Sequence, residues 1–331
     1  MLVGVDIGGT KTAVIVAEDP SRILYREEFS TLQHLGPEQS IEKIKQHIEL
    51  ALERHGGSSS IQLGVSCGGP LDRVRGIIKS PPNLQSWIDI PIKQTLEDWF
   101  NAPCLVENDA NACAVAEHRY GAGKGCNNLI FLTLGTGLGA GLILNGELYR
   151  GATEMAGEIG HVRLTNEGPV GYGKAGSVEG WASGWGMTQY AQERIAAAFR
   201  SGEETQLAPL NAAGRLTAKD IGVAAVNGDA VAQKIVKHTG EKLGHALAIL
   251  VDILNPERII LGGLALRLGS LLLDPALAVL RREALPQSAE GCIVTPAGLG
   301  ERIGDISALC VAEGVSRVSE LGGLPFRRQR R

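Results

Sequence analysis

The chain has 331 residues, which is too long for one compact core and predicts about two domains. Its hydrophobic content of 44% is that of an ordinary globular protein, and a net charge of −4 argues against nucleic acid as a partner. We expect a cytoplasmic protein without a membrane partner, because no apolar run reaches spanning length, the six cysteines form no CxxC pair and the first strand leaves no room for a signal peptide.

The first third of the chain reads as strands accompanied by helices. Apolar residues alternate in the expected strands and recur at helical spacing in the expected helices. In chain order we predict strands over 2–8, 12–18 and 22–29, a helix over 37–55, a Gly/Ser loop over 56–60, a strand over 61–65, a helix over 92–100, a strand over 104–106 and a helix over 112–120.

The second part of the chain repeats the opening pattern. A strand over 128–134, a Gly/Thr turn over 135–139 and a strand over 140–144 match the order of residues 2–17, which suggests a duplicated fold. The remaining predicted elements are helices over 191–200, 218–227 and 229–254, a strand over 258–261, a helix over 266–280, a strand over 292–296 and a helix over 306–319.

These elements predict an α/β protein whose last helix returns to the first domain. We expect the crossover between the domains near residues 118–126. The predicted domains are a small one over 1–118 plus 304–322 and a large one over 119–303, with a disordered basic tail over 323–331.

The turn between the first two strands carries two glycines, two threonines and a lysine. Gly8 and Gly9 let backbone N–H groups approach an anion closely, and the hydroxyls of Thr10 and Thr12 can donate hydrogen bonds to it. Asp6 could reach a hydrated magnesium ion beside a phosphate. The turn is therefore either a phosphate-binding site or an ordinary β-hairpin.

The second Gly/Thr turn, over 133–137, offers backbone donors and a hydroxyl in a short span. Two such hairpins from related halves can close on one phosphate chain, which suits nucleotide binding. A dinucleotide-binding fold is rejected, because here the glycines join two strands rather than a strand and a helix.

The segment 107–111 is the sharpest candidate for catalysis. Four polar residues follow an apolar strand and precede an apolar helix, where α/β proteins place ligands. An aspartate there can accept the proton of a substrate hydroxyl, and a neighbouring asparagine can hold the adjacent hydroxyl. Helix capping by Asn108 or Asp109 is the alternative, although capping needs one such residue rather than four.

Glu158 and His161 lie three residues apart among glycines, and Glu179 follows downstream. These residues could be metal ligands, a hydrogen-bonded set that holds a polyol, or a solvated turn. Metal binding is the weaker interpretation, because a site would normally need more ligands nearby.

Taken in order and spacing, the motifs resemble those of the ROK family (repressors, open reading frames and sugar kinases) from residue 3 to about residue 316. The segments that carry the resemblance are 5–11, 68–72, 80–84, 107–111, 134–139, 157–161 and 261–263. The resemblance implies the two-domain sugar kinase and actin-like (ribonuclease H-like) α/β fold, with a nucleotide and sugar cleft between the domains.

The resemblance also implies a role for individual residues. It implies that Asp109 is the general base for a sugar hydroxyl, normally the one on carbon 6, and that Asp6 lies near magnesium. The implied sugar contacts are Gly68, Gly69, Asn83, Asn108, Glu158, His161 and Glu179. The implied ATP contacts are Gly8, Gly9, Thr10, Lys11, Thr136 and Gly137 at the phosphates, and Gly262 and Gly263 at the adenosine.

The chain departs from the family at its zinc-binding segment, which usually reads C-x-C-G-x-x-G-C-x-E. Counted back from Glu179, the three cysteine positions hold Val170, Tyr172 and Ser177. A tetrahedral site cannot form from His161 alone, so we expect no structural zinc. We expect the loop to be held by packing, with Tyr172, Trp181 and Trp185 as candidates. A second departure is Leu264, where a third glycine is common.

The sequence thus favours an ATP-dependent kinase for a hexose or hexosamine, with ATP and Mg²⁺ as cofactors. Glucose fits the generic contacts, and N-acetylglucosamine, N-acetylmannosamine and fructose remain open. The rival reading is a sugar-binding sensor without catalysis. A kinase is favoured over a repressor, because the chain begins at the phosphate turn with no room for a helix-turn-helix domain. The resemblance also implies a possible homodimer or tetramer.

Overall fold

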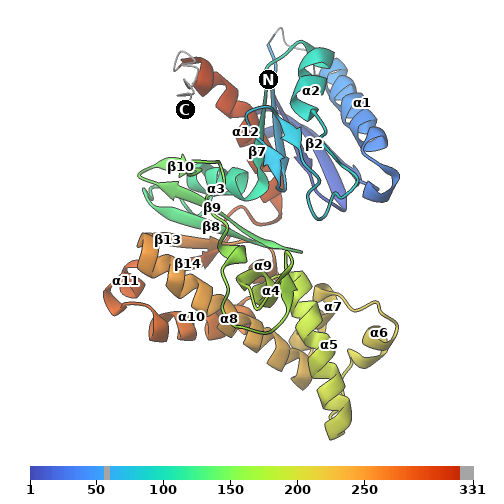
Figure 1. Ribbon diagram of the computed structural model, residues 1–331. Coiled ribbons are helices and arrows are strands. Elements are labelled where there is room, and N and C mark those ends of the chain that lie inside the picture. Colours follow the sequence, from blue (N-terminus) through green and yellow to red (C-terminus); the bar gives the residue numbers. More distant parts are fainter. Residues whose placement is uncertain (56–59, 321–331) are drawn as a thin grey trace, which may run out of the picture. The chain divides into compact units, whose positions relative to one another are not determined.

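The computed structural model describes residues 1–55 and 60–320 (Figure 1). Contacts divide the chain into two compact units: unit 1 comprises Met1–Ala116 and Glu301–Arg331, and unit 2 comprises Glu117–Gly300. The domain boundaries expected from the sequence, 118/119 and 303/304, remain our proposal. The expected tail over 323–331 and the expected Gly/Ser loop, apart from Ser60, lie outside the described residues.

Unit 1 contains a mixed five-stranded sheet in the order β3-β2-β1-β4-β7. The antiparallel pairs join β1 to β2 and β2 to β3, and the parallel pairs join β1 to β4 and β4 to β7. The strands are β1 (Leu2–Ile7), β2 (Lys11–Asp19), β3 (Arg22–Ser30), β4 (Gln62–Cys67) and β7 (Cys104–Asn108). A short ribbon of β5 (Leu71–Asp72) and β6 (Ile77–Ile78) follows β4.

The helices of unit 1 cover both faces of this sheet (Figure 1). The covering helices are α1 (Glu38–Arg54), α2 (Ile92–Phe100) and α12 (Ile303–Glu320). Unit 1 also contains η1 (Gln33–Leu35) and the start of α3 (Asp109–Tyr120). The apolar side chains of alternate strand positions pack against α1 and α2 on one face and against α12 on the other. A Cβ atom at Gly64 would lie 2.1 Å from the backbone nitrogen of Ala312, so α12 lies directly on the strand backbone.

Unit 2 repeats the sheet of unit 1, with the order β10-β9-β8-β13-β14 and the same succession of antiparallel and parallel pairs. Its strands are β8 (Leu129–Leu134), β9 (Leu138–Leu144), β10 (Glu147–Tyr149), β13 (Arg258–Leu261) and β14 (Ile293–Pro296). The correspondence supports the duplication expected from the two Gly/Thr turns.

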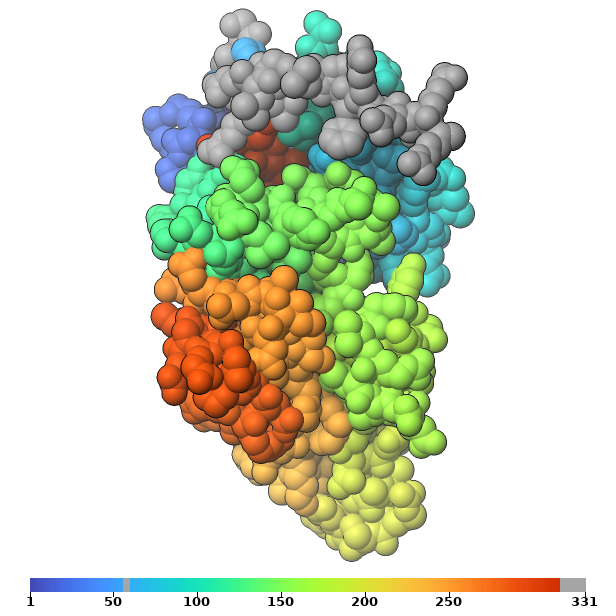
Figure 2. Space-filling view, turned by 60° about the vertical axis from the view of Figure 1, so that its left-hand side comes forward, coloured from blue at the N-terminus to red at the C-terminus, as the bar shows by residue number. Residues whose placement is uncertain are grey.

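Unit 2 also carries a large helical layer, whose α8, α10 and α11 form the orange part of the space-filling view (Figure 2). In chain order its smaller elements are η2 (Ile159–His161), the hairpin of β11 (Val170–Gly171) and β12 (Lys174–Ala175), and η3 (Gly300–Arg302), which extends into unit 1. Its helices are α4 (Val178–Ala182), α5 (Gly184–Ser201), α6 (Ala208–Ala212), α7 (Ala218–Val226), α8 (Ala230–Leu254), α9 (Leu264–Leu268), α10 (Ser270–Glu283) and α11 (Pro286–Gly291).

The predicted α/β class is confirmed, and most element bounds differ from the prediction by a few residues. The single helix expected over 266–280 is wrong, because Gly269 has a φ of 50° and separates α9 from α10. The helix expected over 191–200 begins earlier, at Gly184. In the described parts of the chain, no helix has both the length and the apolar character needed to cross a bilayer.

Candidate functional site

The first glycine turn is fixed from beneath by Thr31, at the end of β3. The Thr31 hydroxyl donates to the carbonyl of Gly8 at 2.7 Å, and its backbone N–H donates to the carbonyl of Thr10 at 3.0 Å. The hydroxyl of Thr12 is buried and shares a 2.9 Å hydrogen bond with the Thr31 hydroxyl. Thr12 therefore stabilises the turn from inside, and the expectation that it donates to an anion is wrong.

Lys11, which was expected to contact a phosphate, already has an acidic partner. Its ammonium group forms an ion pair with Glu28 on the neighbouring strand, and Arg26 binds the same carboxylate at 2.9 Å. The side chain of Lys11 is largely exposed, so the pair is only weakly stabilising. Lys11 can therefore exchange Glu28 for a more strongly charged anion.

Five predicted site residues converge beside this turn, within unit 1. A Cβ atom at Gly9 would lie 2.4 Å from the carbonyl oxygen of Asn83, so the turn and the Asn83 loop are in direct contact. A Cβ atom at Gly68 would lie 3.7 Å from Asn83 Oδ1 and 3.8 Å from Asp109 Oδ2. At Gly69 the nearest atom would be Asn108 Nδ2, at 3.5 Å. The two glycines thus leave a space that faces three polar side chains.

The junction of β7 and α3 assigns different tasks to its polar residues. Asn108 Oδ1 accepts hydrogen bonds from the backbone N–H groups of Ala110 (3.0 Å) and Asn111 (3.3 Å), and so caps α3. Glu107 Oε1 accepts from the side-chain amide of Asn111 at 3.1 Å. Asp109 Oδ1 accepts from Ala110 at 2.8 Å. Capping thus explains part of the segment and leaves Asp109 Oδ2 directed toward Gly68.

Asp6 and Asp109 form an acidic pair in unit 1. Burial, followed by the negative charge of Asp109, raises the pKa of Asp6 to about 7. Asp305 also raises this pKa, while the Ser66 hydroxyl and Arg26 oppose the shift. Burial likewise raises the pKa of Asp109. Because two carboxylates here resist full ionisation together, the site favours a proton or a cation beside them.

The second turn, in unit 2, is held by the start of α5. The backbone N–H of Gly184 donates to the carbonyl of Gly135 at 2.8 Å, and that of Trp185 donates to the carbonyl of Thr136 at 3.1 Å. Gly263 approaches the same strand end with a φ of 55°, and a Cβ atom there would lie 2.1 Å from the carbonyl oxygen of Leu134. Only glycine fits this close approach without displacing the strand.

These groups surround a cavity of about 870 Å³ that lies within unit 2. Gly135, Thr136 and Gly263 line it, as does Leu264, the residue that departs from the family pattern. Gly137 and Gly262 adjoin these residues in the chain without lining the cavity. Its size is that of a small-molecule site.

The lining residues that the sequence did not assign to a ligand site include Lys219, Arg267 and Trp185, the last expected only as a packing residue. They come from α5, α7 and α9, which are separated in the chain, so no local motif predicts that they lie together. Lys219 and Arg267 are the charged side chains among the described lining residues. The cavity is therefore electropositive, which suits an anionic ligand.

Glu179 contacts the second turn from α4. Its Oε2 accepts the backbone N–H of Leu138 at 3.0 Å, and a Cβ atom at Gly137 would lie 2.8 Å from the same oxygen. Gly160 of η2 packs on the stem of Glu179, and His161 is the next residue in the chain. Glu158 is exposed just before η2. Glu179 thus links the turn to the His161 segment.

The positions of the family's zinc cysteines hold residues that do not fit a zinc ion. Val170 offers no donor side chain, the Tyr172 side chain is exposed, and the Ser177 hydroxyl already accepts the N–H of Gly180. Among residues 1–55 and 60–320, no three His, Cys, Asp or Glu side chains are arranged to hold a metal ion. Of the predicted packing residues, Trp181 is buried, whereas Tyr172 and Trp185 are exposed and do not hold the loop by burial.

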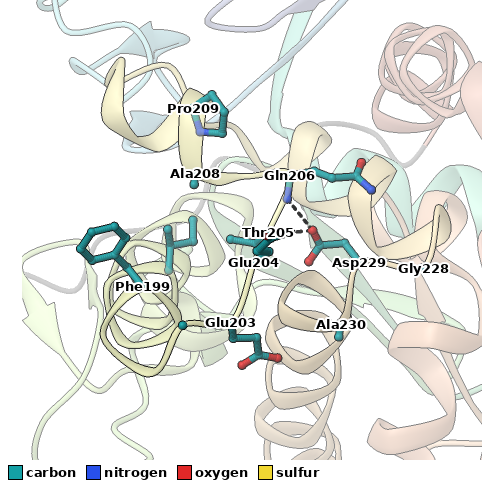
Figure 3. A pocket seen from close by; sticks show the side chains of 12 residues that line it. Phe199, Glu203, Glu204, Thr205, Gln206, Ala208, Pro209, Gly228, Asp229 and Ala230 are labelled. Carbon is teal, nitrogen blue, oxygen red and sulfur yellow. Dashed lines mark hydrogen bonds between the residues drawn. The ribbon is translucent and has the colours of Figure 1, made fainter.

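A second cavity of about 830 Å³ lies between the end of α5, α6 and the start of α8 (Figure 3). Asp229 at its side accepts hydrogen bonds from the Thr205 hydroxyl (2.9 Å) and the Gln206 backbone (2.7 Å), and it caps α8. Burial alone would raise the pKa of Asp229, but these hydrogen bonds lower it. The carboxylate is occupied structurally, so this cavity is not the candidate site.

Comparisons with known proteins agree with the motifs. The model of the ROK family matches residues 2–314. A glucokinase of Halalkalibacterium halodurans is 37% identical over 92% of this chain and 92% of its own. A ROK glucokinase of Streptomyces griseus, solved with glucose and AMPPNP, is 33% identical, with a TM-score of 0.78 over 95% of this chain and 99% of that one.

The relatives are not all kinases. A xylose repressor of Caldicellulosiruptor bescii is 27% identical over 86% of this chain and 70% of its own length. The structural match confirms the sugar kinase and actin-like fold class. The family match spans nearly the whole chain and coincides with the glycine turns, the 107–111 segment and the 157–161 segment, so the chain belongs to the ROK family.

Proposed function

We propose that this chain, an ATP-dependent sugar kinase of the ROK family, phosphorylates glucose or a closely related hexose on its 6-hydroxyl, with Asp109 as the general base. The observation that carries the proposal is the position of Asp109 Oδ2. It faces Gly68 beside the amide of Asn83, at the end of a parallel strand. A substrate hydroxyl in that space would lie within reach of a carboxylate and an amide.

The proposed sugar contacts are those that the family resemblance implies in each unit. Unit 1 contributes Gly68, Gly69, Asn83 and Asn108, whose polar groups face one space. Asn108 Oδ1 is occupied by the helix cap, so its Nδ2 is the group that remains to donate to a sugar oxygen. Unit 2 contributes Glu158, His161 and Glu179. Since Glu179 also binds the backbone at Leu138, sugar binding there would be sensitive to the conformation of the second turn.

The proposed nucleotide contacts are the two glycine turns and the electropositive cavity. They are Gly8, Gly9, Thr10, Lys11, Thr136, Gly137, Gly262 and Gly263. To these we add Lys219 and Arg267, whose charges suit the phosphates, and Trp185, whose indole can contact an adenine ring. ATP use is supported by the AMPPNP complex of the Streptomyces relative.

Asp109 would accept the proton of the hydroxyl as the bond to phosphorus forms. Its raised pKa brings it closer to the operating pH and makes it a stronger base than an exposed aspartate. Asp6 is the residue that we expect near magnesium, where a divalent cation would supply charge neutralisation for the phosphates. The remaining requirement is positioning, because phosphoryl transfer needs in-line geometry more than covalent help.

Two alternatives have support. A kinase for an N-acetylhexosamine or for fructose would use the same base, because specificity depends on side chains around one hydroxyl or acetyl group. The xylose repressor among the relatives supports the second alternative, a sugar-binding sensor without turnover.

We also propose a homodimer or tetramer, which the family resemblance implies, and a cytoplasmic location. The described cysteines are free thiols, which is consistent with a reducing compartment.

The deciding experiment measures ADP release by a coupled assay over a panel of hexoses and N-acetylhexosamines. We expect release with glucose, and its loss in Asp109→Asn. Asp98→Asn, an exposed aspartate on α2, is the matched control. Binding of a sugar by calorimetry without ADP release from any sugar would contradict the kinase and favour the sensor.

A further inference from the structure

The segment 162–177, which we term the strap, leads from η2 into α4. The strap matters because α4 carries Glu179 and η2 carries His161. In the family pattern a zinc ion would organise it, but the residues at the three cysteine positions do not fit that ion. The question is therefore what holds the strap in this chain.

Gln189 on α5 binds both backbone groups of Val170, at the first of these positions. The side-chain amide of Gln189 donates to the carbonyl of Val170 at 2.8 Å, and the N–H of Val170 donates to Gln189 Oε1 at 3.1 Å. One amide side chain thus supplies the donor and the acceptor that a neighbouring strand would supply. This pair attaches the β11–β12 hairpin to α5.

Trp181 on α4 holds the other part of the strap. Its indole N–H donates to the Thr165 hydroxyl at 2.7 Å, and that hydroxyl donates to the carbonyl of Glu167 at 2.6 Å. The ring is buried, and a Cβ atom at Gly168 would lie 2.2 Å from it. His238 of α8 packs on its edge, with ring centroids 5.3 Å apart. The strap is therefore packed on the helical layer as well as hydrogen-bonded.

Ser177 closes the strap at the third cysteine position. Its buried hydroxyl accepts the N–H of Gly180 at 3.1 Å and so caps α4, two residues before Glu179. The next residue, Val178, donates its N–H to the carbonyl of Val162 at 2.8 Å, which joins the two ends of the strap. Ser177 thus fixes the start of α4, at the position where the family pattern has a zinc-binding cysteine.

We propose that the strap is a metal-free version of the family's zinc segment, in which the side chains of Gln189 and Trp181 hold the segment in place instead of the ion. Gln189 is then a positioning residue for His161 and Glu179. The first statement concerns the fold alone. The second rests on the proposed function, because it assumes that His161 and Glu179 contact the sugar.

The first test measures the strap directly, by amide hydrogen exchange on the full-length protein. Gln189→Leu removes both hydrogen bonds to Val170 and leaves a shorter, apolar side chain. We expect exchange in 162–177 to accelerate by about tenfold or more, given the usual strength of two such bonds. Exchange in α8 reports whether the variant remains folded. Trp181→Phe, which removes the indole N–H and part of the ring that packs on Gly168, should accelerate exchange around Thr165.

The matched control is Gln233→Leu, since Gln233 also binds a backbone carbonyl, that of Ala225, at a distance from the strap in the chain. It should leave strap exchange unchanged. Unchanged strap exchange in both Gln189→Leu and Trp181→Phe, with α8 protected, would overturn the assignment.

The second test asks whether a metal contributes. We expect zinc well below one equivalent per chain by mass spectrometry of the purified protein. The melting temperature should not change when a zinc-selective chelator is added in magnesium buffer. One zinc per chain, or a chelator-induced drop in melting temperature, would refute a metal-free strap.

The third test separates positioning from chemistry. With the preferred sugar, Gln189→Leu should raise the sugar KM about tenfold and change kcat much less, because the base Asp109 is untouched. Faster exchange without a change in KM would show that Gln189 only supports the fold. If no sugar is phosphorylated by the wild type, the proposed function fails, while hydrogen exchange and zinc content still decide the first statement.

Discussion

The carboxylate of Glu117 accepts the backbone N–H of Leu299 at 2.9 Å, although the two residues lie 182 positions apart. The same side chain accepts the N–H groups of Gly298 (3.1 Å) and Ala122 (2.7 Å), and it is fully buried. Glu117 begins unit 2 and Gly300 ends it. One carboxylate therefore joins the point where the chain enters this unit to the point where it leaves.

Replacing this side chain should be costly. We expect Glu117→Ala to lower the free energy of unfolding by about 3 kcal/mol, because three backbone N–H groups lose their acceptor in a buried site. Urea unfolding monitored by circular dichroism measures the change. Glu49→Ala, at an exposed position of α1, should stay within about 0.5 kcal/mol of the wild type. A similar effect of the two substitutions would show that the Glu117 hydrogen bonds contribute little.

Asp109→Asn tests the base. The substitution keeps the shape of the side chain and its hydrogen bond from Ala110, but removes the ability to accept a proton. We expect kcat to fall by about 10²–10⁴-fold while the dissociation constant for the sugar stays within a few-fold, measured by the coupled assay and by calorimetry. A wild-type kcat would remove Asp109 from the role of base.

The raised pKa of Asp6 predicts a pH dependence of stability. Between its ordinary value near 3.8 and about 7, the native state holds a proton that the unfolded chain has released. The stability contributed by this proton is complete below the ordinary pKa and is lost as pH rises through about 7. The amide of Asp6→Asn does not ionise in either state. At pH 8 the free energy of unfolding of this variant should therefore exceed that of the wild type by up to about 4 kcal/mol.

Urea unfolding at pH 5 and pH 8 measures this difference, with Asp98→Asn as the control. The gap between Asp6→Asn and the wild type should widen from pH 5 to pH 8. A constant gap at both pH values would mean that Asp6 ionises normally. Activity should be lost in Asp6→Asn whatever its stability, because Asp6 belongs to the proposed nucleotide site.

Lys219 and Arg267 test the electropositive cavity. Each side chain lines the cavity from its own helix, and both are exposed to an incoming ligand. We expect Lys219→Gln and Arg267→Gln each to raise the KM for ATP by about tenfold, the usual size of a charge-assisted contact, and to leave the KM for the sugar unchanged. Lys237→Gln, an exposed lysine of α8 outside the lining, is the control. Equal ATP KM values in all the variants would place the nucleotide elsewhere.

Local patterns predicted most of the fold, because the spacing of apolar residues and the glycines and prolines that end an element are visible over short stretches of sequence. The helix over 92–100 matches α2 at both ends, and the two Gly/Thr turns each connect a β-hairpin of corresponding place in the two sheets. Gly269 escaped prediction, because a glycine inside an apolar run becomes a break only when its backbone takes a positive φ.

Much of the candidate site could also be predicted from the sequence. Its residues 68–69, 83 and 107–109 belong to short polar motifs, which the fold brings together. The places of Trp185 and Arg267 at the cavity were not predicted, because these residues belong to separate helices and share no local motif. Glu117 was missed for a related reason: a glutamate in a helix is expected at the surface, and the N–H groups of Gly298 and Leu299 that donate to it come from the far end of unit 2. Such contacts depend on tertiary structure.

The packing of α12 has a consequence for the order in which the protein is made. One face of the first sheet, formed by Leu2, Ala13, Ile15 and Ala17, is covered by Ala308, Leu309 and Ala312. These covering residues are synthesised roughly 300 positions later, so during synthesis this face of the first sheet lacks its cover until all of unit 2 has been made. Truncation before α12 would therefore release a nascent chain with a permanently exposed apolar sheet, a natural substrate for chaperones.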